Sequence, residues 1–237
     1  MTNLSNRTVG DIVSENYHAA GVFRQFGIDF CCGGGKLLSD VCEKKELSLK
    51  AVQVELEKLA CSDQEENERY DDWTPSFLID YIENNHHAFV RRKCPEIAAY
   101  AAKVARVHGG RNPENKEIFS VFSLLANELM EHLESEETTV FPLIKSVSEA
   151  QENGQAIPAG KFRALRKELE QMEEEHEAAG ESMKRIRELS NSFTPPQDAC
   201  ATYKILYKNL EGFEEDLHKH VHLENNILFK KAEALLR

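Results

Sequence analysis

The segments HLESEETTVF (residues 132–141) and HVHLENNILF (residues 220–229) decide the fold of this chain. Both follow the pattern HxxxExxxxF, and the second repeats the first 88 residues later. Upstream of each histidine, apolar residues recur every three or four positions, which is the spacing of one face of an α-helix. The histidine and the glutamate continue that stripe, and in the first segment we expect it to run on through Val140 and Leu143. The sequence thus predicts two long helices with the same polar residues on their buried faces.

Helical patterns of this kind fill the last two thirds of the chain. We expect helices over about residues 76–107, 113–148, 159–189 and 197–235, separated by short segments that contain glycine or proline. No alternating strand pattern competes with them, so the sequence predicts an all-α fold built on an antiparallel four-helix bundle. The expected domains are a small helical N-terminal domain with the sequence CCGGG, an acidic linker and the bundle, over residues 1–62, 63–75 and 76–237.

The other two helices of the bundle also carry histidines. His176 continues the apolar stripe of the third helix, whereas the periodicity of the first helix does not choose between His86 and His87. Counted from His87, the four histidines are 45, 44 and 44 residues apart, and such regular spacing brings them to a similar depth in an up-and-down bundle. The predicted cluster of imidazoles and carboxylates comprises His86 or His87, His132, Glu136, His176, His220 and Glu224.

This cluster predicts a metal site. A single histidine on an apolar face is usually a satisfied core residue, but a buried and unpaired glutamate is costly. Glu136 and Glu224 each follow a histidine by four residues on the same stripe, so they need a shared cationic partner. Imidazole and carboxylate ligands without thiolate suit iron or manganese, and six ligands exceed a tetrahedral zinc site. Two carboxylates that can bridge predict a two-metal centre; the alternative is a metal-free helical interaction module.

Composition excludes several classes of function. The 237 residues include 29 lysines and arginines against 41 aspartates and glutamates, a net charge of −12. This charge argues against binding to nucleic acid or to an anionic membrane surface. No stretch approaches the roughly 18 apolar residues of a membrane-spanning helix, and no signal peptide is visible, so we expect a cytoplasmic location. The acidic runs at residues 173–175 and 214–215 are expected to be solvated.

The six cysteines are expected to be reduced thiols, and only the adjacent pair Cys31 and Cys32 is unusual. These two precede three glycines and a lysine in a predicted loop, where the glycines allow close approach of the backbone to a partner. The pair could accept iron, exchange electrons or contact a client protein, which makes Cys31 and Cys32 candidate catalytic thiols. The alternative is a small buried turn without chemistry.

Four segments together resemble the repair of iron centres family (RIC, YtfE/ScdA type), di-iron proteins with a hemerythrin-like domain: CCGGGK, EHLESEETTVFP, EEEHEAAGE and HVHLENNILF. The resemblance implies a hemerythrin-like bundle with two iron ions, bridged by an oxo or hydroxo group and by Glu136 and Glu224. It favours His87 over His86, because the first ligand of the family lies eight residues before the proline that is here Pro95. The implied ligands are His87, His132, Glu136, His176, His220 and Glu224.

The resemblance also implies a function in the response to nitrosative stress. Proteins of this family are implicated in repairing iron–sulfur clusters damaged by nitric oxide or oxidants, so the expected partners are damaged iron–sulfur proteins, with NO or O₂ as small ligands. Donation of iron from a labile site and reduction of bound NO both stay open as mechanisms. The alternative function is a hemerythrin-like sensor or carrier of O₂ or NO. A homodimer also stays open.

Overall fold

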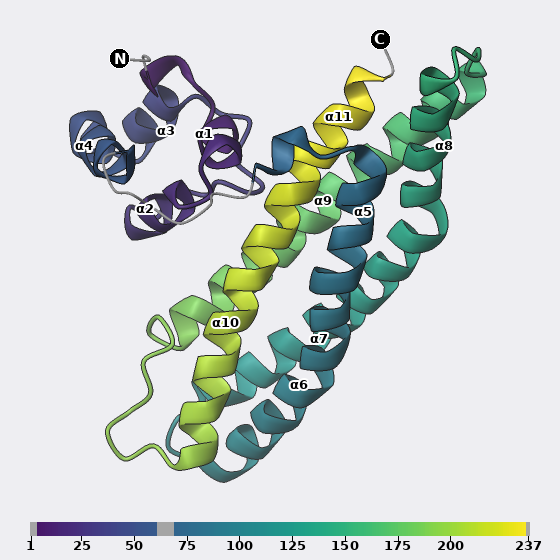
Figure 1. Cartoon of the computed structure of the whole chain (residues 1–237). Coiled ribbons are helices and arrows are strands. Elements are labelled where there is room, and N and C mark those ends of the chain that lie inside the picture. The colour runs from purple at the N-terminus through teal and green to yellow at the C-terminus, as the bar shows by residue number, and fades with distance from the viewer. Residues whose placement is uncertain (1–3, 61–68, 236–237) are drawn as a thin grey trace. The chain divides into compact units, whose positions relative to one another are not determined.

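The computed structural model describes residues 4–60 and 69–235, and these are helical almost throughout (Figure 1). The pairing of Thr8 with Leu37 is an isolated antiparallel bridge rather than a strand. The predicted all-α fold is therefore confirmed for the described residues. The chain divides into two compact units, Met1–Leu78 with Val221–Arg237, and Ile79–His220. None of the helices in the described part of the chain has the length and apolarity needed to span a bilayer.

The larger unit contains the long helices of the bundle, which lie side by side in Figure 1. They are α6 (Ala88–His108), α7 (Glu114–Ser135), α9 (Ala159–Leu189) and α10 (Ala201–Leu223), of which α10 continues past the boundary of the unit. Two shorter helices, α5 (Pro75–Ile82) and α8 (Phe141–Glu152), precede α6 and follow α7. The bounds of α9 coincide with the predicted helix, whereas α10 begins four residues later than expected. The delay arises because Ala199 donates a backbone hydrogen bond to Pro196 and closes a turn there first.

Contacts between α6 and α10 show that these helices are antiparallel. The ring of Phe89 stacks on that of Phe213 with centroids 6.2 Å apart, and Nζ of Lys93 donates to Asn209 at 2.9 Å. The residue number rises along α6 as it falls along α10, which is the pairing of antiparallel neighbours. Phe213 also packs edge-on against Phe122 of α7, so the bundle core joins three of the helices.

The sequence pattern did not predict three interruptions of the long helices. Five-residue π-helical turns interrupt the α-helices: η3 (Glu83–His87), η4 (Glu136–Val140) and η5 (Glu224–Leu228), the last of which leads into α11 (Phe229–Ala234). A π turn inserts one extra residue and so rotates everything beyond it. This rotation explains why Ile144 is fully buried and Leu143, which the predicted stripe contained, is only partly buried.

The smaller unit contains four short N-terminal helices. These are α1 (Val9–Glu15), α2 (Ala19–Gln25), α3 (Leu38–Lys44) and α4 (Leu49–Ala60). The hydroxyl of Thr8 caps α1 by accepting a hydrogen bond from the Asp11 backbone at 3.1 Å. Of the predicted linker, residues 63–68 lie outside the described part, and η2 (Tyr70–Asp72) is a short turn held by packing of buried Tyr70 on Trp73. The predicted division into domains at residues 62 and 75 stays a prediction.

Candidate metal centre

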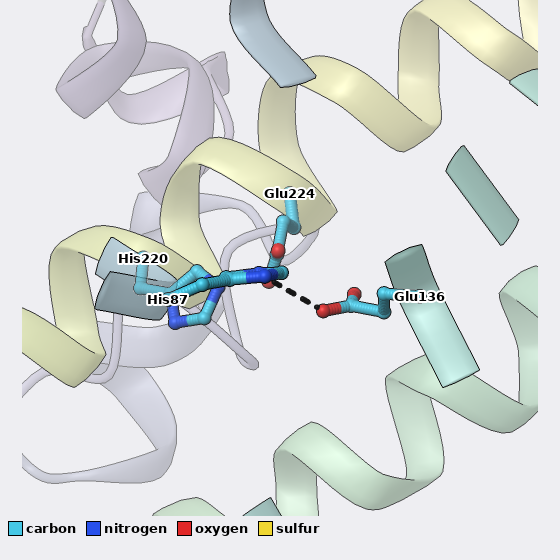
Figure 2. A group of neighbouring side chains, drawn as sticks. All are labelled: His87, Glu136, His220 and Glu224. Atoms are coloured by element: carbon cyan, nitrogen blue, oxygen red, sulfur yellow. Dashed lines mark ion pairs between the residues drawn. The ribbon is translucent and has the colours of Figure 1, made fainter. Parts of the chain in front are cut away.

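Six buried side chains form two overlapping groups whose ligand atoms lie within 4.8 Å of one another in each group. Both groups contain Glu136 and Glu224. They differ in the histidines, which are His87 and His220 in one group and His132 and His176 in the other. Figure 2 shows the first group, in which side chains from different helices point toward one another. Glu224 lies one helical turn beyond His220 on a continuous helix, so local geometry places this pair on one face.

Glu136 lies between the two groups and is completely buried. Its Oε2 atom is 3.3 Å from Nε2 of His87 (dashed in Figure 2) and 3.4 Å from Nε2 of His132. Neither carboxylate oxygen has a hydrogen-bond partner among the described residues. A buried carboxylate without hydrogen-bond partners lowers the stability of the fold unless a cation compensates its charge. The residues present therefore fit a bound metal ion.

His132 and His176 meet through their Nε2 atoms, which are 3.0 Å apart. Two ligands at a right angle on one ion, each about 2.1 Å from it, would be separated by about 3 Å. The two imidazoles are therefore close to the arrangement of neighbouring ligands on a single ion.

Outside the first group, a carboxylate and a guanidinium orient His87. Nδ1 of His87 lies 2.7 Å from Oε1 of Glu137, and Arg91 donates to both oxygens of Glu137 at 2.6 and 3.0 Å. The Arg91 guanidinium, together with His87, lowers the pKa of Glu137, which is therefore ionised and can only accept hydrogen bonds. Nδ1 must then carry the proton and donate it, which presents Nε2 of His87 to the group as its candidate ligand atom.

His132 has a corresponding but less enclosed partner. Its Nδ1 atom lies 2.7 Å from Oε2 of Glu175, whose other oxygen accepts a hydrogen bond from Gln171 at 2.8 Å. The bond to His132 lowers the pKa of Glu175, so again the imidazole donates from Nδ1 and presents Nε2 inward. The expectation that residues 173–175 are merely solvated is wrong for Glu175, because it reaches the histidine of a neighbouring helix.

The expectation that residues 214–215 are solvated is wrong for Glu214. Glu214 is 2% exposed and pairs with Arg187 of α9, so it joins α9 to α10 inside the larger unit. Glu214, Glu137 and Glu175 were not among the predicted site residues. For the last two a signal existed, since each adjoins a predicted ligand and a helix turns by about 100° per residue. Such a neighbour points toward the adjacent helix and can reach the ligand carried there.

The two adjacent histidines of η3 have different surroundings. His87 is a member of the first group, whereas His86 belongs to neither. Nδ1 of His86 lies 3.0 Å from Asp216, and its ring stacks on that of His220 with centroids 5.5 Å apart. His86 therefore supports the ligand His220 rather than joining the group, while the assignment of the six ligands stays a prediction.

The adjacent cysteines lie in a tight loop of the smaller unit. Asp29 accepts hydrogen bonds from the backbone N–H groups of Cys31, Cys32 and Gly33 at 3.0, 3.1 and 2.9 Å. The two sulfur atoms are 3.9 Å apart, and the Cys31 thiol lies 3.2 Å from Asp29. The bond to Cys32, burial and the Asp29 charge together raise the pKa of Cys31 well above its ordinary value. Cys31 is consequently a protonated thiol at neutral pH, and Cys32 is the more exposed of the two.

The side chain of Asn226 leaves no space for a side chain at Gly34, one of the three glycines in the same loop. Its side-chain amide donates to the carbonyl of Cys31 at 2.9 Å, and a Cβ atom at Gly34 would lie 2.3 Å from its Oδ1. His222, two positions from the predicted ligand His220, packs on Phe30 with centroids 5.9 Å apart. Burial lowers the pKa of His222 to about 3, so it is neutral. His222 therefore packs within the smaller unit and belongs to neither ligand group.

Comparison with known families identifies two matching regions. Residues 78–232 match the hemerythrin HHE cation binding domain, and residues 5–60 match ScdA_N, a domain of unknown function (DUF542). The first match runs from α5 to α11 and covers more than half of the chain. It includes all six residues of the two ligand groups.

Individual relatives match nearly the whole chain. The chain is 35% identical over 217 residues to the "Probable iron-sulfur cluster repair protein" of Haemophilus influenzae, which covers 90% of this chain and 91% of that protein. It is 33% identical over 232 residues to the "Iron-sulfur cluster repair protein YtfE" of Escherichia coli O157:H7, with 97% of both covered. The protein of that name from Citrobacter koseri matches with the same identity and coverage.

Proposed function

Because the chain belongs to the hemerythrin HHE cation-binding family, together with the bacterial repair proteins that it matches, we propose that it repairs iron–sulfur clusters damaged by nitric oxide or oxidants. The observation that carries the proposal is the pair of overlapping ligand groups that share Glu136 and Glu224. Such an arrangement suits two metal ions, and imidazole with carboxylate suits iron. The names of the relatives support cluster repair over the alternative of an O₂ or NO sensor.

In the proposed mechanism the protein stores iron for delivery. His87 and His220 would hold one ion, His132 and His176 would hold the other, and Glu136 and Glu224 would contribute carboxylates to both groups. When bound, iron would be an exchangeable, redox-active ion that the protein delivers to a damaged cluster. Glu137 and Glu175 keep the protons of their histidines on Nδ1, so that Nε2 stays available without loss of a proton when iron binds or leaves.

Cys31 and Cys32 are proposed to act as thiols in the same process, with Cys32 as the reactive member. The clients are proposed to be iron–sulfur proteins, and the cytoplasm is the proposed location. The proposed clients derive from the resemblance and from the names of the relatives, and the proposed location derives from the sequence.

Iron content and cluster recovery test the proposed function. Protein purified from iron-replete cells should contain two irons per chain, and the content should fall in Glu136→Ala and Glu224→Ala. Iron-loaded protein should then restore activity to an NO-damaged iron–sulfur enzyme faster than the same concentration of free ferrous iron does. Protein without iron, or recovery no faster than with free iron, would refute cluster repair by donation.

A further inference from the structure

One of the two ligand groups, that of His132 and His176, borders a cavity. A cavity of about 440 Å³ lies between α7 and α9 and is lined by both His132 and His176. Exposed residues of the same two helices, including Glu128, Glu131 and Ala178, complete its lining. The cavity therefore leads from the surface to the side chains of the second group. His87 and His220, which are 0% and 1% exposed, are not part of this lining.

The carboxylates that orient the histidines show the same asymmetry. Glu137, which holds His87, is fastened by two hydrogen bonds from Arg91. Glu175, which holds His132, has a 38% exposed side chain, lines the cavity and is supported by the neutral amide of Gln171. A ligand whose outer partner is held loosely can turn away from its ion more easily. The second group is thus the less rigid as well as the more accessible.

The charge of the cavity suits a cation. Glu128, Glu131 and Glu175 contribute carboxylates, and none of the described lining residues is a lysine or an arginine. Carboxylates around a narrow opening concentrate cations there and accelerate their association, an effect that salt weakens.

We propose that the ion held by His132 and His176 is the exchangeable one, and that it enters and leaves through the cavity between α7 and α9. The ion held by His87 and His220 is then the retained member of the pair. This inference rests on the proposed iron-loaded function and adds which of the two ions is delivered. By microscopic reversibility, one route serves both uptake and release.

Uptake of cobalt(II) tests the role of the acidic lining. Metal-free protein is mixed with cobalt(II), and binding is followed by visible absorption in a stopped-flow instrument. In Glu128→Gln/Glu131→Gln we expect uptake to slow by about three- to tenfold at low ionic strength, and the difference to vanish at high salt. The control, Glu134→Gln/Glu177→Gln, removes the same charge from exposed positions of α7 and α9 outside the lining and should behave as the wild type. Equal slowing in both variants would overturn the role of the lining.

Release of iron tests the route and the assignment. A chelator added to iron-loaded protein should remove one iron per chain quickly and the other slowly. Ala178→Phe narrows the cavity and should slow the fast phase, whereas Ala164→Phe, at an exposed position of α9 outside the lining, should not. A single phase for both ions, or a fast phase indifferent to Ala178→Phe, would overturn this inference alone. Protein that binds no iron would overturn the proposed function with it.

Discussion

Glu136 determines what kind of interior the bundle has. A carboxylate at 0% exposure, with neither oxygen hydrogen-bonded among the described residues, is tolerated only where other interactions compensate its burial. The nearest polar atoms are Nε2 of His87 and of His132, whose Nδ1 atoms donate outward to Glu137 and Glu175. Their lone pairs therefore point at the same place as the carboxylate. All three groups are hydrogen-bond acceptors at these atoms, so they attract a cation and cannot donate hydrogen bonds to one another.

Replacing Glu136 should separate stability from metal binding. We expect Glu136→Leu to lose iron. In the metal-free state its free energy of unfolding should exceed that of metal-free wild type by on the order of 1 kcal/mol, because an apolar side chain replaces a buried charge. Thermal unfolding of both proteins after chelation, together with iron analysis, measures this. A variant that keeps its full iron content would contradict the role of Glu136 as a ligand. The exposed substitution Glu134→Leu is the control.

The two adjacent cysteines should differ in reactivity. The raised pKa and burial of Cys31 leave little thiolate, whereas Cys32 is more exposed. We expect iodoacetamide at neutral pH to label Cys32 before Cys31, as measured by peptide mass spectrometry. Cys94, whose pKa burial raises to about 12, should stay unlabelled in folded protein and serves as the internal control. Labelling of Cys31 at the rate of Cys32 would show that the loop opens.

At the scale of elements, the π turns bring the repeated phenylalanine into the core. Nine residues of a regular α-helix span two and a half turns, so the phenylalanine of HxxxExxxxF would lie about 180° from its histidine. Phe141 and Phe229 are nevertheless each 1% exposed. The extra residue of η4 and of η5 takes back about 100° of this rotation and brings the phenylalanine to the side of its histidine. The glutamate of the motif is the first residue of each π turn. The motif therefore describes a helix with an insertion, which is common at functional sites.

Deleting Thr138 should convert η4 into regular α-helix. Thr138 is exposed, and its removal takes out the extra residue while the helices on both sides keep their buried faces. We expect a folded protein whose iron affinity is lower by about 10- to 100-fold, because the contact between Glu137 and His87 depends on the wide turn. Circular dichroism and competition with a chelator measure the two effects. Deletion of Ser123, in the regular part of α7, should instead unfold the bundle, since it rotates every buried residue beyond it.

At the scale of the whole molecule, the larger unit is held together by side chains that converge on the metal centre. His87, Glu136, His132 and His176 come from three helical segments. Without a cation these groups gain little from being buried together, so binding of metal and folding of the bundle are coupled.

Removal of iron should therefore destabilise the protein. At iron concentrations about 100-fold above the dissociation constant, binding contributes about 2.7 kcal/mol. For a protein of this size that corresponds to a loss of roughly 5–10 °C in Tm on chelation. Calorimetry before and after anaerobic addition of ferrous iron measures the change, and Mg²⁺, which prefers oxygen ligands, should not restore Tm. The metal-free Glu136→Leu variant should not respond to iron.

Helical periodicity, which is local, was sufficient to predict the helices and to propose five candidate ligands, His132, Glu136, His176, His220 and Glu224. The interruptions of the helices were not predictable in this way, since residues compatible with a π turn are also compatible with an α-helix. Periodicity likewise did not distinguish His86 from His87. In the structure the two differ by their partners, Asp216 and Glu137, which lie 130 and 50 residues away in the chain.

The sequence by itself determined that this protein is a helical bundle with imidazoles and carboxylates on its buried faces, because the spacing of apolar residues dictates which side of a helix is covered. Only the tertiary structure decided how those residues differ from one another. Arg91 fastens the partner of His87, while the partner of His132 lines an open cavity. The physical reason is that access and rigidity depend on which helices meet at a residue, and that information is not local in the chain.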